Sequence, residues 1–444
     1  MATVLVSFIG TGSRSGYEYE TTKYFFDGEL NCRETSIFGS ALLQHLKDNN
    51  RSVDRWLILG TDKSIWSELV KMFPDLFSGS GRKLKDPQLE SQREFLEDEA
   101  FYCKDDKNRQ SRISQEKLDE WQKILTDNLT NTRVICRIVG DATEPESQNL
   151  IFQSLLDKIE ENNKVVFDVT HGLRNQPIIT SFVLMYLRYF RNIKAENIEF
   201  YYGAKDLEGK VIKLDFCNKL LEATEAIAID KQTGNYEKIG ENLNLSENFN
   251  SNLKKLTYLD EVNRTNTEIP KQLKNEIAEA DFSPLQKSLA ERFEVPLYWA
   301  SKETLANQLR QKALFAFERR QYYKAVLILL EAIITAYGEN CGILEIADNL
   351  ETRDAREKAE KELIGEWHWA TKTYVGGILN NDERQIILNL KKLRNAVAHG
   401  TDAQGIEPEA VNARNAIESE RKLRQIFSEA NTLFAKIINC EIGK

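Results

Sequence analysis

The sequence predicts an α/β domain with a parallel, doubly wound sheet, followed by an all-helical half. In the first half, short apolar runs alternate with helical patterns, and after about Cys217 the strand patterns stop. A chain of 444 residues is also too long for one ordinary core, which indicates two or three domains. We therefore expect a Rossmann-like domain over 1–217, a helical linker over 218–300 and an all-helical domain over 301–444.

Five apolar runs in the first half are candidate strands. They are Val4–Ile9, Arg55–Thr61, Val134–Val139, Lys164–Thr170 and Asn197–Tyr202. Helical patterns lie between several of them, at Ile37–Lys47, Glu146–Glu161 and Ile178–Arg191. Strands that alternate with helices form parallel sheets, which bind ligands where loops leave the C-terminal ends of the strands. The charged stretch 78–130 interrupts the alternation, and we expect a helical insertion or an excursion at the rim of the sheet.

The second half shows helical periodicity almost throughout. One predicted helix face carries Leu305, Leu309, Ala313 and Phe317. A largely buried helix runs through 326–334, and Gly338 is a candidate cap for its C-terminal end. A third helix contains Ile386, Leu390, Leu393 and Val397 and is expected to end at Gly400. A last helix is predicted from about Glu407 to Ile438.

Composition limits the class of function. The net charge of −9 argues against a general nucleic-acid coating protein, so any RNA must meet a local basic pocket, and no stable DNA complex is expected. The six cysteines form no CxxC pair and there are only four histidines, so we expect reduced thiols and no metal site. No apolar stretch is long enough to cross a membrane, and the apolar N-terminus is typical of a first strand rather than a signal peptide. A cytoplasmic protein is expected.

The segment 394–399 reads Arg-Asn-Ala-Val-Ala-His and lies at the end of the third predicted helix. Five residues correspond to about 500° of helical rotation, so Arg394 and His399 point roughly 140° apart. The two side chains converge only if the last turn loosens, or if two subunits face each other. An imidazole can exchange a proton with a ribose 2′-OH or the leaving 5′ oxygen, and a guanidinium stabilises phosphate charge, without a metal ion.

A purely structural interpretation also exists, because the C-terminal end of a helix favours basic side chains. Glu331, the one acid in the apolar run 326–334, is a candidate partner of the arginine or a locally paired structural glutamate. Segment 394–399 resembles the motif of the HEPN ribonuclease superfamily, in which four to six residues separate Arg and His. This resemblance implies a dimeric helical fold with a composite active site, Arg394 and His399 as catalytic residues, and Asn395 as a supporting polar group.

Two loops of the first half are candidate ligand sites. The first, Gly10-Thr11-Gly12-Ser13, follows the first strand, and its small residues let a ligand approach backbone N–H groups. The second is the strand-to-helix loop 168–177, rich in polar side chains and typical of phosphate, ribose or base recognition. Its candidate ligand-binding residues are Asp168, Thr170, His171, Gly172, Arg174 and Asn175. A structural alternative has Asp168 or Thr170 capping the turn, with the rest solvated.

The loop from Asp168 to Arg174 reads Asp-Val-Thr-His-Gly-Leu-Arg, which resembles a motif of CRISPR-associated Rossmann-fold (CARF) domains. In its domain order the chain is similar to the CARF–HEPN ancillary ribonucleases of type III CRISPR systems, although the sharp motifs cover only 4–13, 168–177 and 394–399. The family implies a homodimer that binds one cyclic oligoadenylate, most often cyclic tetra-adenylate. Binding then activates the HEPN site to cut single-stranded RNA in antiviral defence.

Some members of that family also cut their activator. Thr11, Ser13, His171 and Arg174 are compatible with such ring cleavage, and the sequence does not decide it. Three other functions remain open: a non-enzymatic nucleotide sensor, a dinucleotide-dependent oxidoreductase, and a HEPN toxin under different control. The imperfect glycine spacing after the first strand argues against the oxidoreductase.

Overall fold

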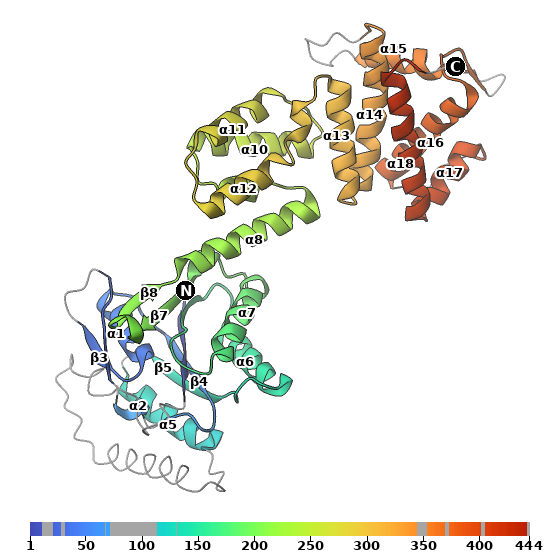
Figure 1. The fold of residues 1–444 in the computed structure, drawn as a ribbon. Helices are drawn as coiled ribbons and strands as arrows, with labels where there is room; N and C mark the ends of the chain where they lie inside the picture. Colours follow the sequence, from blue (N-terminus) through green and yellow to red (C-terminus); the bar gives the residue numbers. More distant parts are fainter. Residues whose placement is uncertain are drawn as a thin grey trace. The chain divides into compact units, whose positions relative to one another are not determined.

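The computed structural model describes nine stretches of the chain, which divide into two compact units, Met1–Glu222 and Ala223–Lys444 (Figure 1). The described stretches are 1–10, 21–27, 32–66, 68–71, 113–129, 131–343, 353–368, 373–400 and 405–441. Most of the charged stretch 78–130 lies outside them, and its last part forms helix α5, Gln115–Asn128. Across the described residues, no helix has both the length and the hydrophobicity needed to span a membrane.

The first unit contains a six-stranded sheet in the order β5-β4-β1-β6-β7-β8. Its strands are β1 Thr3–Ile9, β4 Arg55–Gly60, β5 Arg133–Ile138, β6 Lys164–Asp168, β7 Ile198–Ala204 and β8 Lys210–Lys213. The first five are parallel and match the five predicted strands, which confirms the predicted fold class. Strand β8 was not predicted and pairs antiparallel with β7. Its four residues are too few to show an alternating pattern.

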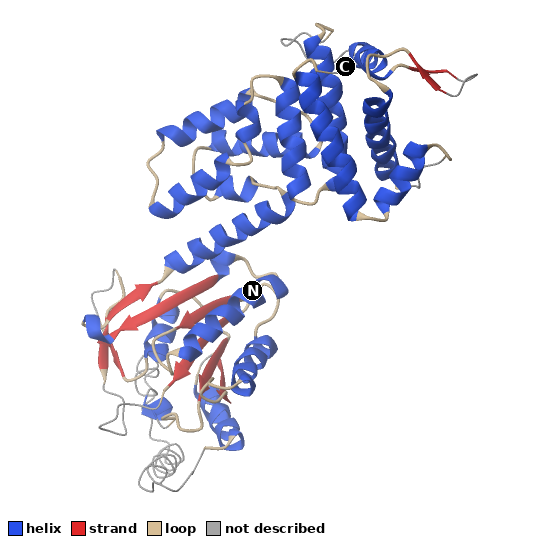
Figure 2. Cartoon of the chain, turned by 45° about the vertical axis from the view of Figure 1, so that its right-hand side comes forward, coloured by secondary structure: helices blue, strands red, loops and turns tan. Residues whose placement is uncertain are grey.

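Helices cover both faces of the sheet. The side chains of β1 point alternately to these two faces and so belong to two separate hydrophobic cores. Leu5 and Ile9 pack with α1, Phe38–Asp48, and with α5. The other face of β1 packs with α6, Pro145–Lys158, and α7, Asn175–Phe190. Figure 2 shows helices on both sides of the strands. The alternation of apolar runs and helices predicted this double layer correctly.

The ends of β1 and β6 form the point where the direction of the chain across the sheet reverses. From β1 the chain continues through α1 and then to β4 and β5 on one side. From β6 it continues through α7, on the opposite face, to β7 on the other side. The loops after two such neighbouring strands diverge and leave a crevice, which is where doubly wound sheets bind ligands.

The second unit begins within α8, Asp215–Thr233, and has two hydrophobic cores. The first core is formed by α8, α9 Glu237–Glu241, α10 Glu247–Glu261, α11 Glu268–Glu279 and α12 Pro284–Glu294. Two aspartates link these helices to α13, Leu305–Glu318, and to the residue that follows it. Asp230 pairs with Arg319, and the Lys312 ammonium lies 2.7 Å from the Asp260 carboxylate.

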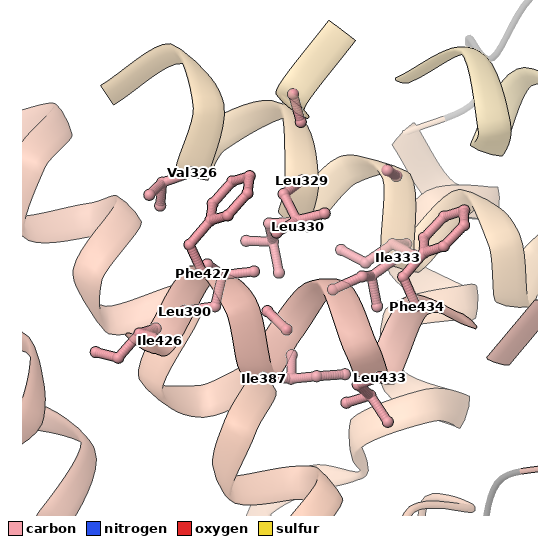
Figure 3. Close-up of a cluster of buried hydrophobic side chains, with 14 of the residues drawn as sticks. Val326, Leu329, Leu330, Ile333, Ile387, Leu390, Ile426, Phe427, Leu433 and Phe434 are labelled. Atoms are coloured by element: carbon pink, nitrogen blue, oxygen red, sulfur yellow. The ribbon is translucent and has the colours of Figure 1, made fainter. Parts of the chain in front are cut away.

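The second core packs α14, α16 and α18 together, as Figure 3 shows through Leu330, Leu390 and Phe427. The helices are α14 Tyr322–Asn340, α15 Arg353–Ile364, α16 Asn381–His399, α17 Pro408–Ile417 and α18 Glu420–Ile438. Short hairpins pair β2 Thr22–Tyr24 with β3 Arg33–Thr35, and β9 Glu366–His368 with β10 Thr373–Val375.

Two predicted helix boundaries are wrong. Gly338 does not cap α14; it is buried inside the helix, which continues to Asn340 because tertiary packing outweighs the low helix propensity of glycine. The predicted last helix is two helices, α17 and α18, separated where Ser419 adopts an extended conformation. No glycine or proline marks this break in the sequence. The predicted end of α16 at Gly400 is confirmed, since Gly400 has a φ of 60°.

Candidate functional site

The first candidate loop is described only at its start. Gly10 follows β1, and its carbonyl accepts a hydrogen bond of 2.9 Å from the backbone N–H of Ile65. The Ser64 hydroxyl donates to the carbonyl of Ile9 at 2.7 Å. The segment after β4 thus supports the end of β1 from one side. Thr11, Gly12 and Ser13 lie outside the described residues.

The loop 168–177 starts at a fully buried carboxyl group. Asp168 accepts a hydrogen bond from the backbone N–H of Thr170 at 2.8 Å, and burial raises its pKa to about 7. The Thr170 hydroxyl accepts from the backbone N–H of Gly203, in β7, at 2.8 Å. Asp168 and Thr170 therefore use these groups to shape the loop, as the structural alternative anticipated.

Two side-chain amides hold the C-terminal end of the loop by hydrogen bonds. The Gln176 side chain, almost fully buried, accepts from the N–H of Leu173 at 2.8 Å and donates to the carbonyl of Gly140 at 2.7 Å. Asn175 donates to the carbonyl of Asp141 at 2.9 Å. These bonds hold the loop against the segment after β5. Gln176 was not among the predicted site residues. A run of polar residues in the sequence does not show which of their side chains is buried.

Gly172 makes the tight course of the loop possible. Its φ is 97°, and a Cβ at this position would lie 2.8 Å from the Cβ of Phe8 on β1. A side chain would therefore meet both backbone strain and a steric clash. The glycine keeps the loop pressed against the end of β1.

His171 joins this loop to the opposite layer of the domain. The backbone N–H of Phe38, the first residue of α1, donates to Nε2 of His171 at 3.0 Å. Burial, with a smaller contribution from Lys205, lowers the pKa of His171 to about 4. Because Nε2 accepts, the ring is neutral and its proton sits on Nδ1. His171 thus connects the loop after β6 to the N-terminus of α1 across the reversal point.

Arg174 has a different environment from the rest of the loop. Its side chain is exposed, and it directly precedes the first turn of α7. The N-terminal end of a helix carries free backbone N–H groups and a partial positive charge, and an adjacent guanidinium adds to both. The outer rim of the loop therefore suits an anionic, phosphate-bearing ligand.

The predicted pair Arg394 and His399 lies on a helix that stays regular to its last residue. Arg394 and Asn395 are half-buried and His399 is exposed. Because α16 does not loosen before Gly400, the separation of roughly 140° around the axis persists. Within the described residues no side-chain hydrogen bond or ion pair joins Arg394, Asn395 or His399 to another group. Within a single copy of α16, the side chains of Arg394 and His399 therefore point in different directions.

The suggested contact between Glu331 and the motif arginine is wrong. Glu331 forms a two-pronged ion pair with Arg356 of α15, at 2.6 and 2.7 Å. Arg356 also donates to Glu360 at 2.8 Å, and Glu360 accepts from Lys391 of α16 at 2.6 Å. Helix α15 supplies the nearer partner for Glu331, which fits the alternative of a locally paired glutamate.

No group of three or more His, Cys, Asp or Glu side chains in the described part of the chain is placed to share a metal ion. The cysteines that the structure describes are free thiols. They are Cys32, Cys136, Cys217, Cys341 and Cys440.

Comparison with known proteins identifies the first unit. Residues 4–212 match the family model of the CRISPR system endoribonuclease Csx1, CARF domain. The CRISPR-associated protein MJ1674 of Methanocaldococcus jannaschii is 25% identical over 220 residues, which are 47% of this chain and 32% of that protein. The chain thus matches only about a third of this relative's length.

A solved structure, Enterococcus italicus Csm6 bound to cyclic hexa-2′-fluoro-hexa-dAMP, covers 99% of this chain and 95% of its own. It is 11% identical with a TM-score of 0.36, which is too low to support conclusions about this chain. The family match instead covers the sheet and both loop-bearing strands described above. Residues 4–212 therefore match a CARF domain of the Csx1 type.

Proposed function

We propose that the chain is a cytoplasmic endoribonuclease that a cyclic oligoadenylate, most simply cyclic tetra-adenylate, activates to cut single-stranded RNA without a metal ion. The observation that carries this proposal is the pairing of a CARF ligand loop with an Arg-Asn…His motif on an intact helix. The first gives the chain a place to sense a nucleotide. The second gives it the two side-chain types that RNA cleavage requires.

The activator fits the loop chemistry. A cyclic oligoadenylate carries a phosphate at each linkage, and the exposed Arg174 beside the start of α7 offers charge and backbone donors to such groups. Gly172 lets the loop pass close to β1, because a Cβ at this position would lie 2.8 Å from the Cβ of Phe8. His171 and Asn175 belong to the same loop. Asp168 and Thr170 keep this loop in shape.

The proposed cleavage uses His399 to move a proton and Arg394 to hold the phosphate. The histidine removes the proton from the ribose 2′-OH or protonates the leaving 5′ oxygen, while the guanidinium stabilises the charge that develops on phosphorus-bound oxygens. Asn395 supplies a further hydrogen bond. Because the two side chains diverge on one regular helix, a shared reaction centre needs α16 from a second copy.

An exposed apolar stripe on α7 supports a homodimer. It consists of Ile178, Phe182, Tyr186, Tyr189 and Phe190, whose side chains are between 49 and 66% exposed. Their spacing of three or four residues places them on one side of the helix. A row of large apolar side chains on one helix is uncommon on monomers and typical of an interface. Since α7 starts where the ligand loop ends, a symmetric contact through α7 would bring two loops to one axis.

Titration calorimetry with cyclic tri-, tetra- and hexa-adenylate tests the sensing half. We expect one ring to bind at one molecule per two chains, and Arg174→Ala to weaken binding by tenfold or more. Phe182→Glu should convert the dimer to a monomer in light scattering and abolish this binding without changing the circular dichroism spectrum. Binding of every ring at one per chain, or of none, would contradict the proposed activator site.

A further inference from the structure

A second cation lies beside Arg394 on α16. Lys391 precedes Arg394 by three residues, so the two side chains are neighbours about 60° apart around the helix and about 4.5 Å apart along it. Lys392, the next residue, points roughly 160° away from Arg394. Only one of these adjacent lysines therefore lies next to the motif arginine.

Lys391 is the outer end of a row of charges that crosses three helices. Glu331 of α14 holds Arg356 of α15, Arg356 holds Glu360, and Glu360 accepts from Lys391 at 2.6 Å. The row contains two carboxylates and two cations, so it is neutral as a whole. Within it, Lys391 is 33% exposed and Glu360 only 16%. Arg356 is 27% exposed, so the lysine is the more exposed of the two cations.

Glu360 keeps a partner if Lys391 moves away. One oxygen of Glu360 accepts from Lys391, and the other accepts from Arg356 at 2.8 Å. Burial acts to raise the pKa of Glu360, but the two cations together lower it. The carboxylate then keeps its ion pair with Arg356. A lysine held in a half-exposed pair gives up little free energy when a phosphate replaces its partner.

We infer that Lys391 is a second RNA-binding residue, which exchanges its ion pair with Glu360 for a backbone phosphate next to the one held by Arg394. The inference rests on the proposed RNA cleavage and names a further group of the same site. An ammonium on a flexible stem contacts phosphate as a point charge and reads no base. We therefore expect Lys391 to raise the affinity for single-stranded RNA of any sequence.

The test measures RNA binding separately from cleavage. Fluorescence anisotropy of a labelled single-stranded RNA is recorded with the activated His399→Ala protein, so that the RNA stays intact. We expect Lys391→Gln to weaken binding 3- to 10-fold at about 0.1 M salt and to reduce the slope of log K against log salt by about 0.7. The matched control, Lys392→Gln, should leave the slope unchanged. In the cutting enzyme, Lys391→Gln should raise KM while kcat stays within about twofold.

Glu360→Gln separates phosphate binding from a structural role. If Lys391 binds RNA, freeing it from Glu360 leaves binding as tight as in the parent or tighter. If the lysine only ties α16 to α15, then Glu360→Gln and Lys391→Gln remove the same ion pair and weaken binding alike, which would overturn the inference. An unchanged Kd and slope in Lys391→Gln would also overturn it, while cleavage by the wild-type chain would leave the proposed function standing. A parent protein that binds no RNA would contradict both.

Discussion

The loop 168–177 and the segment 394–399 differ in how many contacts the chain itself gives their side chains. Asp168, Thr170 and Gln176 use their hydrogen bonds within the domain, where β7 and the segment after β5 hold the loop. In contrast, Arg394 and His399 end a regular helix, with no side-chain partner among the described residues. The loop at the sheet edge is fixed within a single chain, whereas the proposed reactive groups at the helix end would converge only across a subunit contact.

The two histidines show the same difference. His171 is half-buried, and its Nε2 is occupied by the N–H of Phe38. His399 is exposed in the last turn of α16. The first histidine joins two structural layers, and the second is available to a substrate.

The largest expected effect is on cleavage. His399→Ala should reduce kcat by at least about 100-fold, because general acid–base catalysis contributes about that much or more. Its exposed side chain contributes little packing, so the thermal unfolding midpoint should change by less than about 2 °C. Gel-based cleavage rates and calorimetry on the same preparation measure both. A variant that cuts RNA at the wild-type rate would remove His399 from the mechanism.

Gly172→Ala tests how tightly the sensor loop is packed. The new Cβ meets the backbone strain of a positive φ and a contact of 2.8 Å with Phe8, so we expect a loss of about 1–3 kcal/mol in unfolding free energy. Gly400→Ala is the matched control: its φ is also positive, but a Cβ there meets nothing within 4 Å, and about 1 kcal/mol is expected. Urea unfolding measures both, and equal losses would show that Phe8 can yield.

The pH dependence of the free energy of unfolding distinguishes Asp168 and His171, whose pKa shifts act with opposite signs. His171, with a pKa of about 4, stays neutral in the folded chain while the unfolded chain protonates it below about 6.5. Its contribution to the free energy of unfolding therefore rises with pH between these values. Asp168, with a pKa of about 7, keeps a proton that the unfolded chain loses above about 3.9, so its contribution falls as pH rises from about 4 to 7.

In the wild type these two slopes nearly cancel around pH 5. Asp168→Asn leaves only the histidine effect, so its free energy of unfolding should rise from pH 5 to pH 6.5. His171→Gln leaves only the aspartate effect, and the same quantity should fall over that interval. Urea titrations at both pH values supply the slopes. Parallel slopes in the two variants would show that one of the groups is not buried as described.

The smallest effect concerns Glu331. Because Glu331 pairs with Arg356 and not with Arg394, Glu331→Gln should change kcat by less than about threefold. It leaves Arg356 with Glu360 as its remaining charged partner. Single-turnover cleavage under saturating activator measures the change. A loss as large as that of Arg394→Ala would mean that the glutamate reaches the reaction centre after all.

The parallel sheet could be predicted from the sequence because buried strands appear as continuous apolar runs bounded by polar segments. Strand β8 could not be predicted, because Lys-Val-Ile-Lys carries only two apolar residues and owes its pairing to β7. The break between α17 and α18 was missed for a related reason. Ser419 has an extended backbone between α17 and α18, and no glycine or proline marks this break in the sequence.

The candidate site was predicted at the level of its loops and not of its contacts. The composition of 168–177 indicates a polar loop at a sheet edge, but it does not distinguish the buried Asp168 and Gln176 from the exposed Arg174. Likewise, helical spacing correctly places Arg394 and His399 on one helix, and it cannot tell which cation Glu331 meets. These distinctions depend on residues more than 20 positions away in the chain.

Cleavage of a fluorescent single-stranded RNA in EDTA, with cyclic tri-, tetra- and hexa-adenylate added separately, tests the central claim most directly. The account predicts cleavage with one ring only, most simply the tetra-adenylate, and none with His399→Ala. Absence of cleavage with every ring, from a folded dimer, would contradict the activator assignment and favour a nuclease under other control or a binding protein. Cleavage that the His399→Ala protein retains would contradict the assigned reaction centre.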